Sequence, residues 1–129
     1  MTAMTPQPQP QPQPGFRVKR VYDSPDPDDG ARVLVDRLWP RGITKAQARV
    51  DRWPKDLTPS TELRRWFHAD RDARGAEFAR RYRAELAAPE VQQDLRDLRE
   101  LAAEGPVTLL TAVQDPAHSH VPVLLDVLR

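Results

Sequence analysis

Hydrophobic and polar residues alternate in three short segments near the N-terminal end of the chain, and this alternation predicts β-strands. The predicted strands are FRVKRVY (16–22), ARVLVD (31–36) and the shorter VDRW (50–53). SPDPDDG (24–30) separates the first two, and its Pro, Asp and Gly residues are typical of a turn. This connection is shorter than the dozen or so residues that a parallel crossover usually takes. Spacing alone therefore does not decide whether the first two strands are parallel.

Apolar residues recur every three or four positions further along the chain, which predicts amphipathic helices. The predicted helices are a short one after Ser60, one over 72–88, one from Pro89 to Gly105 and a last one near 121–129. Ser60 is the expected N-cap of the short helix, whose end carries His68. Ser119 is the expected N-cap of the last helix, because Pro122 then falls in the first turn, where no intrahelical donor is lost.

One segment, VTLLTAV (107–113), is apolar without interruption, which is typical of a strand covered on both faces at the centre of a sheet. The order of elements predicts a small three-layer α/β fold, in which a short sheet is flanked by helices. A chain of 129 residues leaves room for one such domain, here residues 16–129. Residues 1–15 alternate Gln and Pro and offer no apolar face, so they predict a disordered tail.

The amino-acid composition excludes several kinds of site and several classes of protein. The chain has no cysteine, which excludes disulfides, thiolate metal sites and cysteine nucleophiles. No apolar run approaches the roughly 20 residues of a membrane span, and no signal peptide is visible, so we expect a cytoplasmic protein without a membrane partner. Twenty Lys and Arg residues oppose 19 Asp and Glu residues. This near balance argues against a domain built to hold a large polyanion.

Polar residues follow the predicted strands directly, and ligands of open α/β sheets bind at the carboxyl ends of strands. The candidate ligand-binding residues are Arg37, Trp39, Arg41, Trp53, Lys55 and Ser60. Two of the segments repeat the pattern Trp-Pro-basic, at 39–41 and 53–55. Arginine forks, a lysine and the start of a helix bind anions, and indole rings can form flat walls. The pattern predicts a crevice for phosphate or carboxylate; the alternative is that both tryptophans are core residues.

The segment QDPAHSH (114–120) supplies the candidate catalytic residues. His120 is the expected general acid or base, Asp115 the carboxylate that orients it, and His118 a further member of the group. These three side chains could also hold a metal ion, but no second pair of ligands supports that reading, and we predict no metal or cofactor. The chain has neither a G-x-S-x-G elbow nor a glycine-rich phosphate loop.

The stretches LVDRLWPRG, DRWPKDLTPSTELRRWFHAD, FARRYRAELA and GPVTLLTAVQDPAHSHVPVLLDVL together resemble the YeaO-like branch of DUF488, a bacterial family of unknown function. The resemblance runs from about residue 19 to 128. It implies a small cytosolic α/β protein with a mainly parallel sheet, and it brings no assigned activity. The polar positions of the family pattern fall here on Asp36, Arg37, Trp39, Arg41, Trp53, Lys55, Asp56, Ser60, Trp66, His68, Asp115, His118 and His120.

The chain departs from that family pattern in two places. Thr111 stands where the resemblance leads us to expect tyrosine, and HSHVPVL replaces HNHAVVL. Any role that requires that tyrosine, or a flexible loop after His120, does not carry over. Thiol chemistry of a more distant branch does not carry over either, because the chain lacks cysteine.

Three functional hypotheses follow from the sequence. The first is a hydrolase or transferase acting on a phosphorylated, nucleotide-like or carboxylated small molecule in the predicted crevice. The second is a nucleic-acid-binding module whose tryptophans stack on unpaired bases. The third is a protein-interaction module that uses the proline tail and the arginine-rich face of the 72–88 helix. The sequence favours a small anionic ligand and leaves open whether the chain is an enzyme and whether it forms oligomers.

Overall fold

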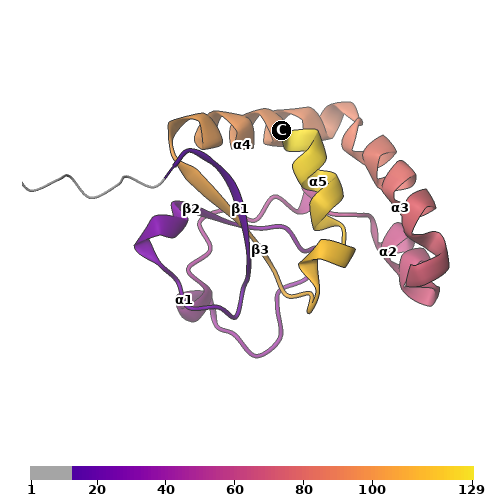
Figure 1. Cartoon of the computed structure of the whole chain (residues 1–129), viewed down its shortest axis with the longest axis horizontal. Coiled ribbons are helices and arrows are strands. Elements are labelled where there is room, and N and C mark those ends of the chain that lie inside the picture. Colours follow the sequence, from indigo (N-terminus) through magenta and orange to yellow (C-terminus); the bar gives the residue numbers. More distant parts are fainter. Residues whose placement is uncertain (1–12) are drawn as a thin grey trace, which may run out of the picture.

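The computed structural model describes residues 13–129, so most of the predicted tail lies outside the described residues. The strands are β1 (Gly15–Arg20), β2 (Ala31–Leu34) and β3 (Pro106–Thr111). The α-helices are α1 (Lys45–Ala48), α2 (Thr61–Ala69), α3 (Arg71–Leu86), α4 (Gln92–Glu104) and α5 (Val121–Leu128). Figure 1 shows α2 and α3 together at one end of the molecule, with α5 and α4 beside the strands. This arrangement confirms the predicted α/β fold.

The sheet has the order β1-β3-β2, and both strand pairs are parallel. Leu109 at the centre of β3 is in register with Val18 of β1 and with Val33 of β2. The predicted strand at 50–53 contributes only one isolated parallel bridge, between Arg52 and Val33. The mainly parallel sheet that the resemblance implied is therefore confirmed. β1 and β2 are parallel despite their short connection, because β3 lies between them and they are not neighbours.

Gly30 allows the chain to return from the carboxyl end of β1 to the start of β2 within this short connection. Its backbone has a φ of 62°, a left-handed conformation that favours glycine. A Cβ atom at this position would lie 2.0 Å from the carbonyl oxygen of Pro106, which begins β3. The connection therefore presses directly against the central strand, and only a residue without a side chain fits.

A buried carboxylate fixes the same connection. Asp29 pairs with Lys19 Nζ at 3.0 Å and with the Arg32 guanidinium at 2.5 Å. The hydroxyl of Thr108 in β3 donates to the Asp29 carbonyl oxygen at 2.7 Å. Burial acts to raise the pKa of Asp29, but the N–H of Asp26 and the two cations outweigh it and hold that pKa below its ordinary value. Asp29 thus binds β1, β2 and β3 to the connecting segment.

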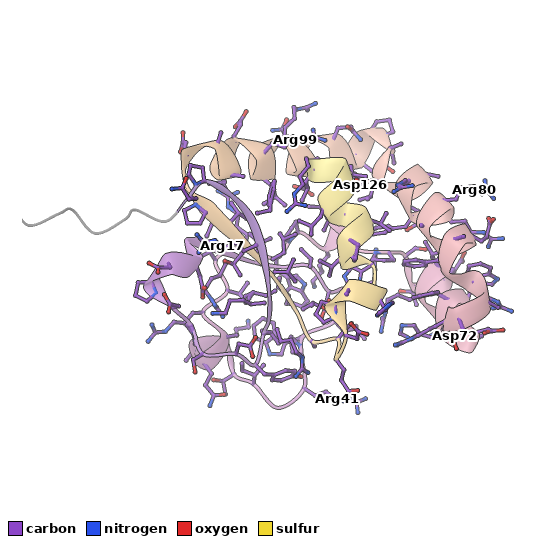
Figure 2. The ribbon with its side chains drawn as sticks, in the orientation of Figure 1. Arg17, Arg41, Asp72, Arg80, Arg99 and Asp126 are labelled. Atoms are coloured by element: carbon purple, nitrogen blue, oxygen red, sulfur yellow. The ribbon has the colours of Figure 1, made fainter. Side chains whose placement is uncertain are left out.

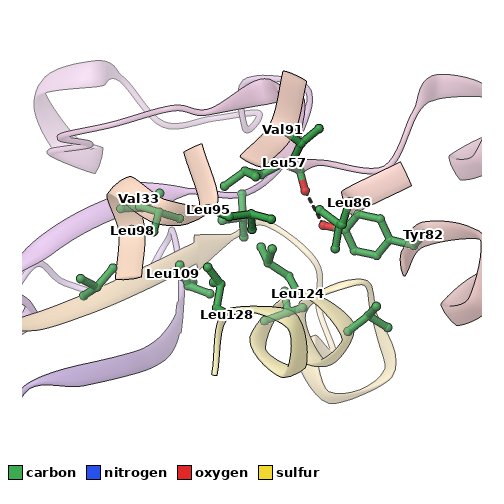
Figure 3. Close-up of a cluster of buried hydrophobic side chains, with 14 of the residues drawn as sticks. Val33, Leu57, Tyr82, Leu86, Val91, Leu95, Leu98, Leu109, Leu124 and Leu128 are labelled. Atoms are coloured by element: carbon green, nitrogen blue, oxygen red, sulfur yellow. Dashed lines mark hydrogen bonds between the residues drawn. The ribbon is translucent and has the colours of Figure 1, made fainter. Parts of the chain in front are cut away.

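The main hydrophobic core fills the space between the sheet and helices α2 to α5. Val33 and Leu109 point into it from the sheet, and Leu95, Leu98 and Leu124 from the helices, as Figure 3 shows. Tyr82 is fully buried in this core, and its hydroxyl donates a hydrogen bond to the Leu57 carbonyl oxygen (dashed line in Figure 3).

A second, smaller core lies on the opposite face of the sheet. Its buried residues are Val21, Leu34, Ala48 and Leu110, and Trp39, Ile43, Val50, Trp53 and Ala112 pack against them. These residues come largely from α1 and the loops around it. The third layer of the fold is therefore mostly loop, whereas the first consists of helices.

The structure confirms most predicted helix boundaries and corrects one. Ser60 is the N-cap of α2, where its hydroxyl accepts a hydrogen bond from the Leu63 N–H at 3.2 Å. The N-cap of α5 is His120, not Ser119, although the Ser119 hydroxyl accepts from the Val121 N–H at 3.1 Å. Within residues 13–129, no helix has both the length and the apolar character needed to cross a membrane.

Candidate functional site

Asp36 connects the strand ends at the carboxyl edge of the sheet. It follows β2, and its Oδ1 accepts a hydrogen bond from the Thr111 hydroxyl at 2.7 Å. Its Oδ2 accepts from the Ala112 N–H at 2.7 Å, and its backbone carbonyl accepts from Trp53 Nε1 at 2.6 Å. The hydroxyl of Thr111 thus has a structural partner at the position where the family resemblance suggested tyrosine. Both carboxylate oxygens of Asp36 are satisfied within the protein.

His120 lies next to this carboxylate, at the start of α5. Its Nε2 is 2.6 Å from the Val35 carbonyl oxygen and 3.5 Å from Asp36 Oδ1, and its side chain is 11% exposed. A carbonyl oxygen can only accept, so Nε2 carries the proton and Nδ1 is the acceptor. Burial lowers the pKa of His120, Asp36 and Val35 oppose that shift, and Arg64 reinforces it. The imidazole is therefore neutral near pH 7.

Asp115 was expected to orient His120, but it contacts His118 instead. Asp115 Oδ2 lies 2.6 Å from His118 Nδ1, and the two side chains are 63% and 83% exposed. The reason is local: His118 ends the 3-10 turn that begins directly after Asp115, whereas His120 begins α5 and turns inward. The carboxylate beside His120 is that of Asp36. Among the residues that the structure describes, no three His, Asp or Glu side chains converge as metal ligands.

Two of the predicted anion-binding groups are engaged inside the protein. The Arg37 guanidinium donates from Nε to the Pro59 carbonyl at 3.0 Å and from Nη2 to the Thr58 carbonyl at 3.2 Å. Ser60, at the start of α2, binds the Glu85 carboxylate through its hydroxyl at 2.6 Å and its N–H at 2.8 Å. Arg37 therefore holds the segment that leads into α2, and a carboxylate of the chain itself occupies the start of this helix.

The two Trp-Pro-basic motifs do meet in space. The rings of Trp39 and Trp53 pack edge to face, with centroids 5.5 Å apart, and Lys55 Nζ lies 4.1 Å from the centre of the Trp53 ring. Trp39 Nε1 donates to the Ile43 carbonyl at 2.8 Å. Arg41 is separate from this group, because its side chain is exposed and projects away from the ribbon (Figure 2). Both indoles pack against the second core.

The sequence reasoning missed Arg64, a partly buried cation on α2. In the described part of the chain its guanidinium has no ion-pair partner within 4.0 Å. Burial lowers the pKa of His68, and Arg71, Arg64 and His120 lower it further. Because Arg64 also lowers the pKa of His120, the three side chains lie within electrostatic reach of one another. The spacing of Arg64 and His68, four residues apart on one helix face, was the available signal.

Comparisons with known proteins agree with this fold. The chain matches the model of a family described as the inactive DUF488-N3 subclade over residues 15–129. It is 49% identical over 113 residues to the uncharacterised protein Rv3073c of Mycobacterium tuberculosis H37Rv, covering 88% of this chain and 92% of that protein. It is 47% identical over 114 residues to the uncharacterised protein YeaO of Escherichia coli K12, covering 88% of this chain and 96% of YeaO.

No solved structure matches the chain significantly. The family is nevertheless established, because the family model covers nearly the whole described chain and the relatives match over most of their length. The chain is a YeaO-like member of the DUF488 family, within the group described as its inactive DUF488-N3 subclade.

Proposed function

We propose that the chain binds a small anion at the carboxyl edge of its sheet and does not convert it chemically. The observation that carries this proposal is the group formed by Arg64, His68 and His120. Arg64 brings the positive charge to this group as a partly buried guanidinium without an ion-pair partner among the described residues, and a negative ligand would neutralise that charge. This function would use the predicted edge of the sheet with a partly different set of residues.

The chemistry of Arg64 and His120 restricts which anions can bind. Arg64 offers a guanidinium that can hold two oxygens of a phosphate or carboxylate. His120 donates Nε2–H to Val35, so it offers a neutral Nδ1 that accepts a hydrogen bond. An anion that also carries an O–H group satisfies both partners. Phosphate monoesters in their monoanionic form and hydroxycarboxylates have this combination.

The side chains that could react are already hydrogen-bonded within the protein, which favours binding without catalysis. Both oxygens of Asp36 accept protein hydrogen bonds, and the Ser60 hydroxyl is bound to Glu85. The hydroxyl of Tyr82 donates to a buried carbonyl, and burial raises its pKa far above the ordinary value. The description of the family as inactive supports the same reading. The competing hypothesis is a hydrolase or transferase in which His120 acts as acid or base.

Thermal unfolding with a panel of ligands tests the proposal. The panel contains inorganic phosphate, phosphate monoesters, hydroxycarboxylates and plain carboxylates. A ligand at about 100 times its Kd adds about 2.7 kcal/mol to the free energy of unfolding, which raises the midpoint by several degrees. We expect this rise for the first three classes, its loss in Arg64→Ala, and its retention in Arg65→Ala, which removes an exposed arginine from the same helix.

The outcomes separate the hypotheses. An unchanged midpoint across the panel, or equal losses in both arginine variants, would overturn the anion site. Recovery of the bound compound unchanged after long incubation is expected, whereas a product would support the enzyme. The same assay on Arg41→Ala and Lys55→Ala shows whether the ligand reaches the Trp-Pro motifs. A salt-dependent shift of a single-stranded oligonucleotide in place of the small ligands would support the nucleic-acid hypothesis.

A further inference from the structure

An open depression of about 660 Å³ lies between the turn after β1 and the segment around α1. This volume is within the range of about 300–1,000 Å³ that is common for small-molecule sites. Tyr22, Asp23, Ile43 and Arg49 are among the residues that line it. None of the residues of the proposed anion site takes part, so the depression is a separate candidate site.

Tyr22 gives the depression a fixed aromatic surface. The side chain is 42% exposed, although its hydroxyl donates to the Arg41 carbonyl at 2.8 Å. The guanidinium carbon of Arg20 lies 5.1 Å from the ring centroid and covers one face. Ile43, half-buried, lines the same depression. A ring that is held in place and left exposed can contact an apolar group without losing much conformational freedom on binding.

Arg49 contributes a cation from an unusual backbone position. Its φ of 49° and ψ of 48° are left-handed, and no other residue except glycine has a positive φ in the described part of the chain. Arg49 is the C-cap of α1, where its backbone N–H donates to the Lys45 carbonyl, so this conformation ends the helix beside the depression. Across residues 13–129, no carboxylate pairs with the Arg49 guanidinium. This cation is therefore available to a ligand.

Asp23 contributes the opposite charge. Its Oδ2 accepts a hydrogen bond from the backbone N–H of Arg20 at 3.1 Å, which orients the carboxylate at the end of β1. The other oxygen has no protein partner among the hydrogen bonds of the described residues. A ligand with only a negative charge would be repelled by Asp23, and one with only a positive charge by Arg49. A ligand that carries one positive and one negative charge can pair with both Asp23 and Arg49.

We infer that the depression binds an aromatic amino acid in its zwitterionic form. The carboxylate pairs with the Arg49 guanidinium, which can hold both of its oxygens. The ammonium group pairs with Asp23, and the ring packs against Tyr22 and Ile43. Recognition therefore requires the two charges and the ring together.

Titration of the ¹⁵N-labelled full chain with L-phenylalanine, followed by NMR, tests this inference. The Trp39 indole N–H is a built-in reporter, because it donates to the carbonyl of Ile43, which lines the depression. Its resonance should shift with the amide resonances of Tyr22 and Ile43, whereas the indole of Trp66 on α2 should not. 3-Phenylpropionate and phenethylamine each lack one charge, and each should bind about tenfold more weakly or worse.

Three variants complete the test. Arg49→Gly removes the guanidinium and suits the left-handed backbone, so it should fold and bind L-phenylalanine about tenfold more weakly or worse. Asp23→Asn keeps an acceptor for the Arg20 N–H and should weaken binding similarly. Lys45→Ala removes a cation of α1 outside the lining and should leave binding unchanged. Absence of shifts at millimolar L-phenylalanine, equal affinity for the singly charged analogues, or full affinity in Arg49→Gly would overturn the inference.

Discussion

Glu85 of α3 holds Ser60 at the start of α2 with both of its carboxylate oxygens. Oε2 accepts from the Ser60 hydroxyl at 2.6 Å, and Oε1 accepts from the Ser60 N–H at 2.8 Å. The same hydroxyl accepts from the Leu63 N–H at 3.2 Å and so caps the helix. A negative charge at a helix N-terminus is favourable. The contact therefore links the cap of α2 to the end of α3.

Replacing Glu85 by alanine should lower the free energy of unfolding by about 2 kcal/mol, because two charge-assisted hydrogen bonds are lost. Urea denaturation measures this change. Glu100→Ala, an exposed glutamate of α4, is the matched control and should stay within about 0.5 kcal/mol of the parent. A double-mutant cycle with Ser60→Ala should give a clear coupling energy. Additive effects would contradict the contact.

Acidification should destabilise the protein through His120. Its pKa is lowered in the folded state by burial, so below the ordinary value of 6.5 the unfolded chain binds a proton that the folded chain does not. The stabilising contribution is complete above about pH 6.5 and is lost as the pH falls through the folded-state pKa. Denaturation at pH 7.5, 6.5 and 5.5 should show this fall, and His120→Gln should reduce its slope. His118→Gln, which changes an exposed histidine, is the comparison variant.

The neighbouring aspartates of the β1–β2 connection should respond very differently to the same substitution. Asp29→Asn leaves the buried Arg32 and the partly buried Lys19 without a countercharge, and we expect a loss of about 3 kcal/mol. Asp28→Asn changes an exposed side chain and should alter the free energy of unfolding by less than about 0.5 kcal/mol. Chemical denaturation of both variants checks this contrast. Similar losses in the two would argue against the buried ion-pair network.

Alanine substitutions at Gly30 and Gly42, which both have a positive φ, separate the cost of backbone strain from the cost of a steric clash. Gly30→Ala combines a left-handed backbone with a Cβ atom 2.0 Å from the Pro106 carbonyl oxygen, so we expect several kcal/mol of destabilisation or loss of soluble protein. At Gly42 the φ is 77° but no atom lies within 4 Å of the new Cβ. Gly42→Ala should therefore cost only about 1–2 kcal/mol. Expression level and thermal midpoint report both results, and equal behaviour would refute the close approach at Gly30.

Local patterns in the sequence were sufficient for most of the fold. The four-residue spacing of Phe78, Tyr82 and Leu86 predicts α3, and all three side chains are buried. The continuous apolar run after Gly105 predicts the central strand, and β3 pairs on both sides. The predicted strand at 50–53 forms only an isolated bridge, in which Arg52 pairs with Val33 of β2.

The site was harder to predict because its contacts join residues that are distant in sequence. His120 meets the carbonyl of Val35, 85 residues earlier, and no spacing rule connects them. The sequence offered Asp115 as its partner by proximity, but a tight turn directs that carboxylate to His118. No local pattern in the sequence singles out Glu85, although it binds Ser60 from 25 positions away. Residue type identified the candidates, and tertiary contacts determined their partners.

The central position of β3 has a consequence for how the protein forms during synthesis. β1 and β2 do not pair with each other, and each pairs only with β3. The residues of β3 lie about 90 positions after their partners in β1 and about 75 positions after their partners in β2. Until the ribosome has released Thr111, both early strands have unpaired edges, whereas α2, α3 and α4 can already form from local contacts. The sheet can therefore assemble only after β3 has been synthesised, whereas the helices that precede β3 need not wait for it. During that interval the two waiting strands are the segments most open to pairing with another chain.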